Sequence, residues 1–293
     1  MSAARREACL GIVGGSGIYD IEWLANPRWE KVVGPFGKPS DNLLIGELDG
    51  VPLVFLPRHG RGHRLSPTEV NFRANIDALK RAGVTDVIAL SAVGSLRDDL
   101  PPGTFVIVDQ FVDRTFARVK SFFGTGLVAH VSMASPVCAR LGDVLEAAAR
   151  ESSAPCVRGG TYIVMEGPQF STRAESELYR TWGCSVVGMT NMPEAKLARE
   201  AELCYATVAM VTDYDCWHPG HGHVTVDQVV EVMAKNVVAA RETVRRAAPR
   251  LHQRPLVCPH GCDHALDGAI MTAPEARDPA VAARLSCVAG RVL

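Results

Sequence analysis

The chain has 293 residues, of which 47% are hydrophobic and 22% charged, enough for one large globular domain or two ordinary ones with a buried core. Its 31 Lys and Arg balance 32 Asp and Glu, so it lacks the positive field that holds nucleic acid or an anionic membrane, and we expect a small-molecule partner. The absence of any run of about 18 apolar residues also excludes a transmembrane helix.

The N-terminal segment begins basic and leads into the first expected strand, at residues 9–15. Its apolar run is short and has no cleavage site, so we expect a cytoplasmic protein. Gly14, Gly15, Ser16 and Gly17 follow, and such a turn lets backbone N–H groups and a hydroxyl approach an anion. The turn has neither the dinucleotide-binding G-x-G-x-x-G pattern nor a P-loop lysine, and by itself a structural turn explains it slightly better.

Further short apolar runs predict strands, and amphipathic segments between them predict helices. The expected strands are residues 51–57, 84–94, 103–113, 160–168, 184–190 and 204–213. Ser66, Pro67 and Glu69 predict a helix start and Gly83 its end, and Pro193 lies near a second helix start. Apolar strands separated by helices indicate an α/β fold, with a mixed, largely buried central sheet flanked by helices.

No linker or repeat divides the chain, so we expect a single domain over residues 1–293. After residue 249 the composition changes to Pro, Cys, His and short apolar pieces. We interpret residues 250–293 as a C-terminal appendage of that domain, ending in a helix within residues 278–293.

Polar residues follow several expected strands at their carboxyl ends, where ligands of open α/β sheets gather. They are Ser16, Arg58, His59, Ser91, the backbone of Ala92 and Thr190, the last preceded by Met189. Arginine offers a forked donor to phosphate oxygens, and histidine a shorter one. The set contains hydroxyls and cations without a cluster of metal-binding acids, which favours inorganic phosphate over the alternative of a solvated basic loop.

Two other strand ends carry further candidate residues. Phe170 and Ser171 follow the strand at 160–168; a single loop phenylalanine usually belongs to the core, but it could also stack on a ring. Asp213 and Asp215 follow the last apolar run, and a buried carboxylate costs several kcal/mol unless a neighbour or a ligand satisfies it.

The nine cysteines are scattered and odd in number, which argues against a disulfide framework and favours buried, small hydrophobic side chains. Cys258 and Cys262 form the one local cluster, with His260 and His264 beside them. Because no second well-spaced pair occurs elsewhere in the sequence, we expect no metal site.

Taken together, these motifs resemble the purine nucleoside phosphorylase superfamily, in its trimeric branch, and within it the 5′-methylthioadenosine phosphorylase family. The resemblance extends from about residue 10 to residue 235 and includes GIVGGSGIYD, PRHGRGHRLSPTEVNFRANIDALK, MEGPQFSTRAESELYRTWG and GMTNMPEAKLAREAELCYATVAMVTDYDCW. It implies a pentosyltransferase of purine and methionine salvage that cleaves 5′-methylthioadenosine with phosphate, giving adenine and 5-methylthioribose 1-phosphate. It also implies a homotrimer or a dimer of trimers, with phosphate as co-substrate, no cofactor and no metal.

The resemblance assigns the site position by position. Phosphate contacts Ser16, Arg58, His59, Ser91, Ala92 and Thr190; Met189 lies against the ribose; Phe170 and Ser171 lie beside the base; Val226, Val229 and Val230 line the methylthio pocket; and His130 reaches in from a neighbouring subunit. The family often has threonine where this chain has Ser16, which keeps the hydroxyl. Asp213 and Asp215 contact the purine edge.

The chemistry of glycosidic cleavage fits the two aspartates, since negative charge develops on the departing base. Asp213 would donate a proton to purine N7, and Asp215 would accept from the 6-amino group. Related 6-oxopurine enzymes usually have asparagine at the first acidic position, so TDYD favours a 6-aminopurine. The alternatives left open are a broader or 6-oxopurine nucleoside phosphorylase, such as one for methylthioinosine, and a nucleoside-binding protein without turnover.

Overall fold

Most of the apolar runs form strands and the amphipathic segments form helices in the structure, a computed structural model that describes residues 5–15, 17–220 and 226–293. The strands are β1 (Arg5–Glu7), β2 (Leu10–Gly14), β3 (Ala25–Glu30), β4 (Leu43–Leu48), β5 (Val51–Pro57), β6 (Asp86–Ser95), β7 (Phe105–Ile107), β8 (Gln110–Asp113), β9 (Cys156–Arg158), β10 (Thr161–Val164), β11 (Val186–Gly188), β12 (Cys204–Asp213) and β13 (Gln253–Pro255). The helices are α1 (Phe72–Arg81), α2 (Ala139–Glu151), α3 (Arg173–Thr181), α4 (Asn191–Glu200), α5 (Val226–His252) and α6 (Pro279–Ala289), with short 3-10 helices at Cys262–His264 and Pro274–Ala276. The expected α/β fold is confirmed.

An 11-stranded mixed sheet forms the centre, in the order β3-β4-β5-β2-β6-β11-β10-β8, with β12 paired to β6 and β7, and β9 paired to β7. The pairs β5–β2, β2–β6 and β6–β12 are parallel, so the carboxyl ends of these four strands point the same way. Arg58 and His59 follow β5, and Asp213 ends β12, so the topology brings these candidate residues to the same edge of the sheet. β1 and β13 form a separate two-stranded antiparallel sheet.

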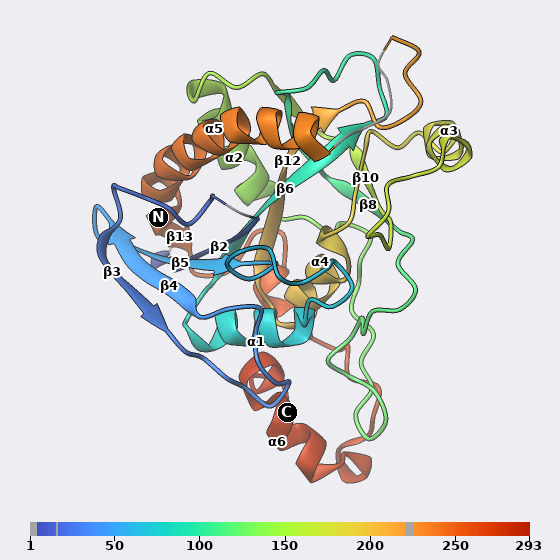
Figure 1. Cartoon of the computed structure of the whole chain (residues 1–293). Helices are drawn as coiled ribbons and strands as arrows, with labels where there is room; N and C mark the ends of the chain where they lie inside the picture. The colour runs from blue at the N-terminus through green and yellow to red at the C-terminus, as the bar shows by residue number, and fades with distance from the viewer. Residues whose placement is uncertain (1–4, 16, 221–225) are drawn as a thin grey trace.

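Side chains alternate between two cores on opposite faces of the sheet. Along β6, Val87, Ala89 and Val93 belong to the core shared with α1, α4 and α6, whereas Ile88 and Leu90 belong to the core shared with α2 and α5. The two helix groups lie on opposite sides of the strands in Figure 1. Full burial of each such Leu, Ile or Val contributes roughly 1.5–3 kcal/mol, so both faces stabilise the strand that carries the candidate site.

Helix α1 begins later than the sequence predicts. The Ser66–Glu69 segment closes a local turn instead, in which Ser66 N donates to Glu69 Oε2 at 3.0 Å. Asn71 is the true N-cap, since its side chain accepts from Ala74 N at 3.1 Å. The expected end is confirmed, because the helix stops at Arg81 and Gly83 follows with φ 83°.

The expected strand at residues 103–113 is two strands, β7 and β8, which pair with different neighbours. Neither β4 nor its hairpin with β5 was expected from the sequence, although the dipeptide Asp49-Gly50 indicates a turn there. Asp49 and Gly50 have φ of 50° and 80°, the backbone of a two-residue hairpin turn that Asp-Gly favours.

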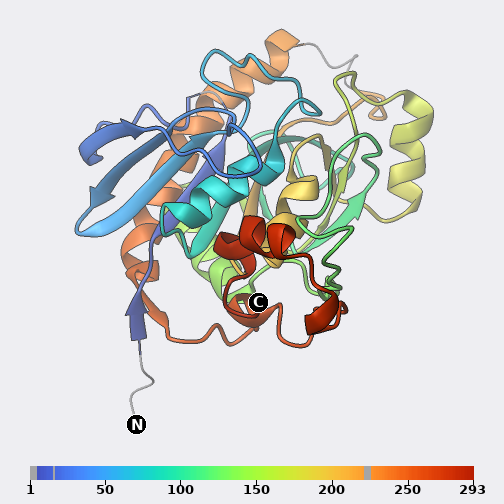
Figure 2. The same cartoon turned by 90° about the horizontal axis from the view of Figure 1, so that it is seen from below.

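The tail after α5 returns to the body of the molecule (Figure 2). Leu285, Val288 and Ala289 of α6 join the core that contains α1. The expected terminal helix is α6, which Asp278 caps by accepting from Ala280 N and Val281 N. Among the described residues, no helix combines the length and the apolar character needed to cross a bilayer.

Candidate active site

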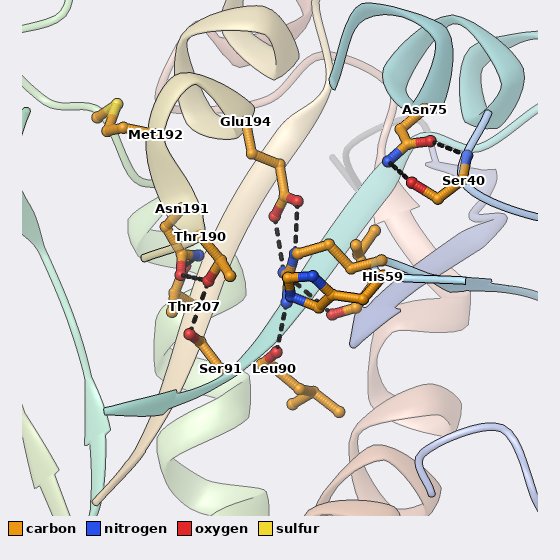
Figure 3. A network of polar contacts seen from close by, with 12 residues as sticks. Ser40, His59, Asn75, Leu90, Ser91, Thr190, Asn191, Met192, Glu194 and Thr207 are labelled. Carbon is orange, nitrogen blue, oxygen red and sulfur yellow. Dashed lines mark hydrogen bonds and ion pairs between the residues drawn. The ribbon is translucent and has the colours of Figure 1, made fainter. Parts of the chain in front are cut away.

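Arg58 follows β5 directly and is buried, with only 1% of its surface exposed. Its Nε and Nη2 pair with Glu194 Oε2 and Oε1 at 2.8 and 2.9 Å, and Nη1 and Nη2 donate to the carbonyls of Leu90 and Val13 at 2.9 and 3.3 Å. Figure 3 labels two of these partners, Glu194 and Leu90, and draws their bonds as dashed lines. These bonds use four of the five N–H donors of an arginine and hold the fifth in a fixed direction.

Ser91 was expected at the carboxyl end of its strand, and it lies inside β6, four residues before the strand ends at Ser95. The reason is that β2 pairs with β6 only as far as Val13 and Ala89, so β6 continues past the edge of β2 and presents Ser91 there. Ser91 Oγ lies 2.8 Å from Thr190 Oγ1 and 3.1 Å from Tyr162 Oη. Two of the hydroxyls expected to bind phosphate are therefore in direct contact.

A buried polar chain links these hydroxyls to the ion pair, and Figure 3 shows its part from Ser91 through Thr190 to Asn191. Thr190 Oγ1 donates to Asn191 Oδ1 at 3.2 Å, and Asn191 Nδ2 donates to Tyr205 Oη at 2.5 Å and to Thr207 Oγ1 at 2.7 Å. Tyr205 Oη donates to Glu194 Oε1 at 2.8 Å. The sequence does not indicate Asn191, Tyr205 and Glu194 as site residues, because their spacing along the chain does not reveal that they form a chain of bonds to Arg58.

His59 is buried beside Arg58, and its Nδ1 lies 3.0 Å from the carbonyl oxygen of Leu65. Because a carbonyl only accepts, Nδ1 carries the hydrogen and the neutral ring keeps a lone pair on Nε2. Burial, helped by the charge of Arg58, lowers the pKa of His59 to about 4. At neutral pH this ring is an uncharged acceptor at Nε2, stacked on His63 with ring centres 4.5 Å apart.

Asp213 ends β12, and Asp215 lies in the turn after it with φ 51°. Asp213 Oδ1 accepts from Asp215 N at 2.8 Å, and Oδ2 accepts from Thr212 Oγ1 at 2.7 Å. Burial raises the pKa of Asp213 above its usual range. Burial also raises the pKa of Asp215; the Ser176 hydroxyl opposes this shift, and the charge of Asp213 adds to it.

Asp215 also carries an unmet acceptor. The residue is 4% exposed, and Oδ2 has no hydrogen-bond partner among the described residues. Leaving a buried polar atom unpaired costs about 1–3 kcal/mol. A ligand that donates a hydrogen bond to this oxygen would recover that free energy.

Gly94 makes room for the two aspartates, and the sequence analysis did not single it out. A Cβ at Gly94 would lie 2.9 Å from Asp213 Oδ1 and 3.3 Å from Asp215 Cβ. The register of β12 against β6 shifts between Val211 and Asp213 at this point. A glycine inside a predicted strand often marks such a close approach, so a signal was present.

Phe170 and Ser171 lie in a loop near the aspartates. Phe170 is 46% exposed, so it is not a core residue. The carbonyl of Ser171 accepts from Cys216 Sγ at 3.3 Å, which joins this loop to the turn that holds Asp215. Met189 lies beside the same loop, because a Cβ at Gly167 would meet its Sδ at 2.5 Å.

The remaining candidates are less enclosed. Ser16 lies outside the described residues. Val226, Val229 and Val230 lie in the first turns of α5, where Val229 is half-buried and the other two are exposed. Further along this helix, Asn236 Nδ2 donates to the carbonyl of Val211 at 3.0 Å. His130 is exposed beside the tail, where its N donates to the carbonyl of Ala269 at 2.8 Å.

Comparisons with known proteins identify a family and several similar proteins. The model of the phosphorylase superfamily matches residues 10–249. An S-methyl-5′-thioadenosine phosphorylase of Rhodospirillum rubrum is 62% identical over 293 residues, covering 100% of both chains. A methylthioadenosine phosphorylase from an antarctic soil metagenomic library aligns with TM-score 0.89 and 45% identity over 97% of this chain and 99% of that one. The Schistosoma mansoni methylthioadenosine phosphorylase in complex with adenine aligns with TM-score 0.85 and 39% identity over 90% and 99%.

Proposed function

Because the chain belongs to the phosphorylase superfamily, we propose that it is an S-methyl-5′-thioadenosine phosphorylase. This pentosyltransferase moves the methylthioribosyl group of 5′-methylthioadenosine from adenine to inorganic phosphate. The observation that carries the proposal is the pair of buried aspartates at the end of β12, where Asp215 Oδ2 lacks a partner within the described part of the chain. A purine 6-amino group is a donor of the kind this oxygen needs.

In the reaction the bond between C1′ and N9 breaks, and its electron pair stays with the base. A phosphate oxygen forms the new bond to C1′, and the base takes a proton. Burial raises the pKa of Asp213, which supports its role as the group that protonates N7. General-acid help of this kind contributes about 10²–10⁴-fold to the rate.

Burial, together with the charge of Asp213, raises the pKa of Asp215. One proton on Asp213 and an ionised Asp215 give the arrangement that adenine needs: a donor at N7 and an acceptor at the 6-amino group. A 6-oxopurine would place a carbonyl lone pair against Asp215 instead. This supports a 6-aminopurine substrate over the broader or 6-oxopurine alternative.

In the site we propose, dipoles contribute more than net charge to the binding of phosphate. The Arg58 guanidinium is already paired with Glu194, so it contributes one directed N–H beside the hydroxyls of Ser91 and Thr190 and the Ala92 backbone. Hydroxyl hydrogens rotate, so both hydroxyls can turn from their internal partners to a phosphate oxygen. Neutral His59 can accept from a phosphate hydroxyl through Nε2. Phosphate is a co-substrate, and these steps use no organic cofactor.

Completion of the site by a neighbouring subunit is part of the proposal. The segment that carries His130 also exposes the apolar side chains of Phe116, Val119 and Val128. Exposed apolar patches mark interaction sites, and they support a homotrimer or a dimer of trimers. Light scattering tests this, and a stable, fully active monomer would remove the subunit contribution.

We also propose a cytoplasmic location. All nine cysteines are free thiols rather than disulfides, which fits a reducing compartment. Fractionation of the source cells tests it, and recovery outside the cytoplasm would contradict it.

One set of initial rates tests the function. Release of free purine is measured from methylthioadenosine, adenosine and methylthioinosine, with and without phosphate. We expect phosphate-dependent release of adenine and the highest kcat/KM for methylthioadenosine. Preference for methylthioinosine would support the 6-oxopurine alternative, and binding without turnover in saturating phosphate would show a nucleoside-binding protein.

A further inference from the structure

Cys258 and Cys262 have no second cysteine pair near them in the sequence. In the fold, Cys138 and Cys204 lie beside them. Four thiol sulfurs lie within 4.8 Å of one another, and all four side chains are buried. This cysteine cluster consists of Cys138, Cys204, Cys258 and Cys262. Cys138 is at the N-cap position of α2, Cys204 is the first residue of β12, and the other two belong to the tail, so three distant segments meet there.

The spacing of the sulfurs fits four ligands around one ion. Cys138 Sγ and Cys258 Sγ are 3.8 Å apart. A tetrahedral zinc site with bonds of about 2.3 Å has sulfur-to-sulfur edges of about 3.8 Å. A disulfide requires about 2.05 Å, and the four thiols are free.

The tail loop is folded so that both of its thiols face the cluster. Three residues separate Cys258 from Cys262, within the spacing of paired zinc ligands. The Asp263 carboxylate accepts from Cys258 N at 2.9 and 3.1 Å, and Gly261 N donates to the Cys258 carbonyl at 2.9 Å. Gly261 has φ 66°, which glycine adopts without strain.

Positive groups lie next to the sulfurs. Four thiolates and one divalent ion sum to a net charge of about −2, which needs compensation in a buried site. Arg254 is buried and its Nη2 donates to Cys204 Sγ at 3.6 Å, while the same guanidinium pairs with Asp86 at 3.1 Å and Asp263 at 3.0 Å. Arg140 also pairs with Asp86.

The position of the cluster indicates a structural role. All four cysteines belong to the apolar core shared with α2 and α5, which excludes water. Cys204 and Asp213 are the two ends of β12, and ten residues of strand span roughly 30 Å at about 3.3 Å each. An ion in the cluster would therefore hold the tail and not touch the reacting atoms.

We propose that the cysteine cluster binds one zinc ion as a tetrathiolate and so fastens the tail to β12 and α2. The soft sulfur ligands and tetrahedral spacing favour zinc over harder ions such as magnesium or calcium. Binding displaces the thiol protons to solvent, so no redox step is involved. This inference does not depend on the proposed catalytic function.

Metal analysis of the full chain, purified without chelator, tests the proposal. We expect one zinc per chain, retained on dialysis and released by a mercurial reagent. Cys258→Ser should lower the zinc content about tenfold or more and reduce Tm. Cys184→Ser, at a buried thiol outside the cluster, is the matched control and should keep its zinc.

A second measurement needs no variant, in case Cys258→Ser does not fold. After zinc removal, wild-type protein titrated with Co²⁺ should develop the charge-transfer and visible bands of tetrahedral thiolate coordination. Four alkylatable thiols with neither bound metal nor cobalt bands would overturn the proposal. So would iron in place of zinc, or a disulfide within the cluster in freshly purified protein.

Discussion

The half of the candidate site around Arg58 and the half around Asp215 are built in opposite ways. Around Arg58, the ion pair with Glu194 and the chain through Tyr205 satisfy the buried groups internally. Around Asp215, Oδ2 has no partner among the residues that the structure describes, and burial disfavours the ionised carboxyl. The first half is organised before any ligand arrives, whereas the second keeps an unfavourable group that a ligand can satisfy. Changes in the two halves should therefore separate stability from turnover.

The largest effect should come from Asp213→Asn. An amide cannot protonate N7, so we expect kcat for methylthioadenosine to fall about 10²–10⁴-fold, or about 3–5 kcal/mol, while KM for phosphate stays nearly constant. Steady-state kinetics at varied phosphate measures both. Asp143→Asn, at an exposed position on α2, is the control and should leave both unchanged. Equal turnover in Asp213→Asn and wild type would refute the proton-donor role.

Glu194→Gln tests the internally satisfied half. It leaves Arg58 charged, buried and unpaired, and loss of one partner of a buried ion pair costs about 3–5 kcal/mol. Urea unfolding gives the loss in free energy. The matched control is Glu177→Gln, which breaks the exposed pair with Arg180 and should cost less than about 1 kcal/mol. Similar losses of unfolding free energy in the two variants would show that the buried ion pair does not stabilise the part of the site around Arg58.

His59 should contribute to the dependence of the unfolding free energy on pH. Its pKa is about 4 in the folded protein and about 6.5 when unfolded, so the unfolded chain binds more protons between these values. The stabilising contribution is complete above pH 6.5 and is lost as pH falls toward 4, by about 3 kcal/mol at most. His59→Gln should flatten the fall in unfolding free energy over that window. An unchanged slope, matching that of exposed His130→Gln, would contradict the burial of a neutral ring.

The smallest effect on stability should come from Asp215→Asn. Since burial raises the pKa of Asp215, its ionised form costs free energy as pH rises through that pKa, and the uncharged amide removes this cost. We expect an unfolding free energy at pH 7 equal to wild type or about 1 kcal/mol higher. Preference for methylthioadenosine over methylthioinosine should fall at the same time. A loss of stability with an unchanged substrate preference would show that Asp215 stabilises the fold and does not bind the purine.

Local patterns in the sequence predicted much of the fold and of the site. The apolar runs gave the central strands, because a strand buried on both faces needs nearly continuous hydrophobic residues. The same runs placed Arg58 and Asp213 at strand ends, where ligands of α/β sheets gather. Local rules were weaker at boundaries: α1 begins after Asn71 because that side chain caps it, although Ser66 and Glu69 carry a similar signal.

By itself the sequence determined the fold class, the family resemblance and the residue types at the site, since each depends on neighbours along the chain. Only the tertiary structure decided which distant groups meet. Arg58 pairs with Glu194 across 136 positions, and Cys138 meets Cys258 across 120. Spacing along a chain does not specify such contacts, because they arise when buried charges and thiols are packed together between strands and helices. For this reason the single cysteine pair in the tail did not predict a metal site, whereas the four cysteines that meet in the fold do.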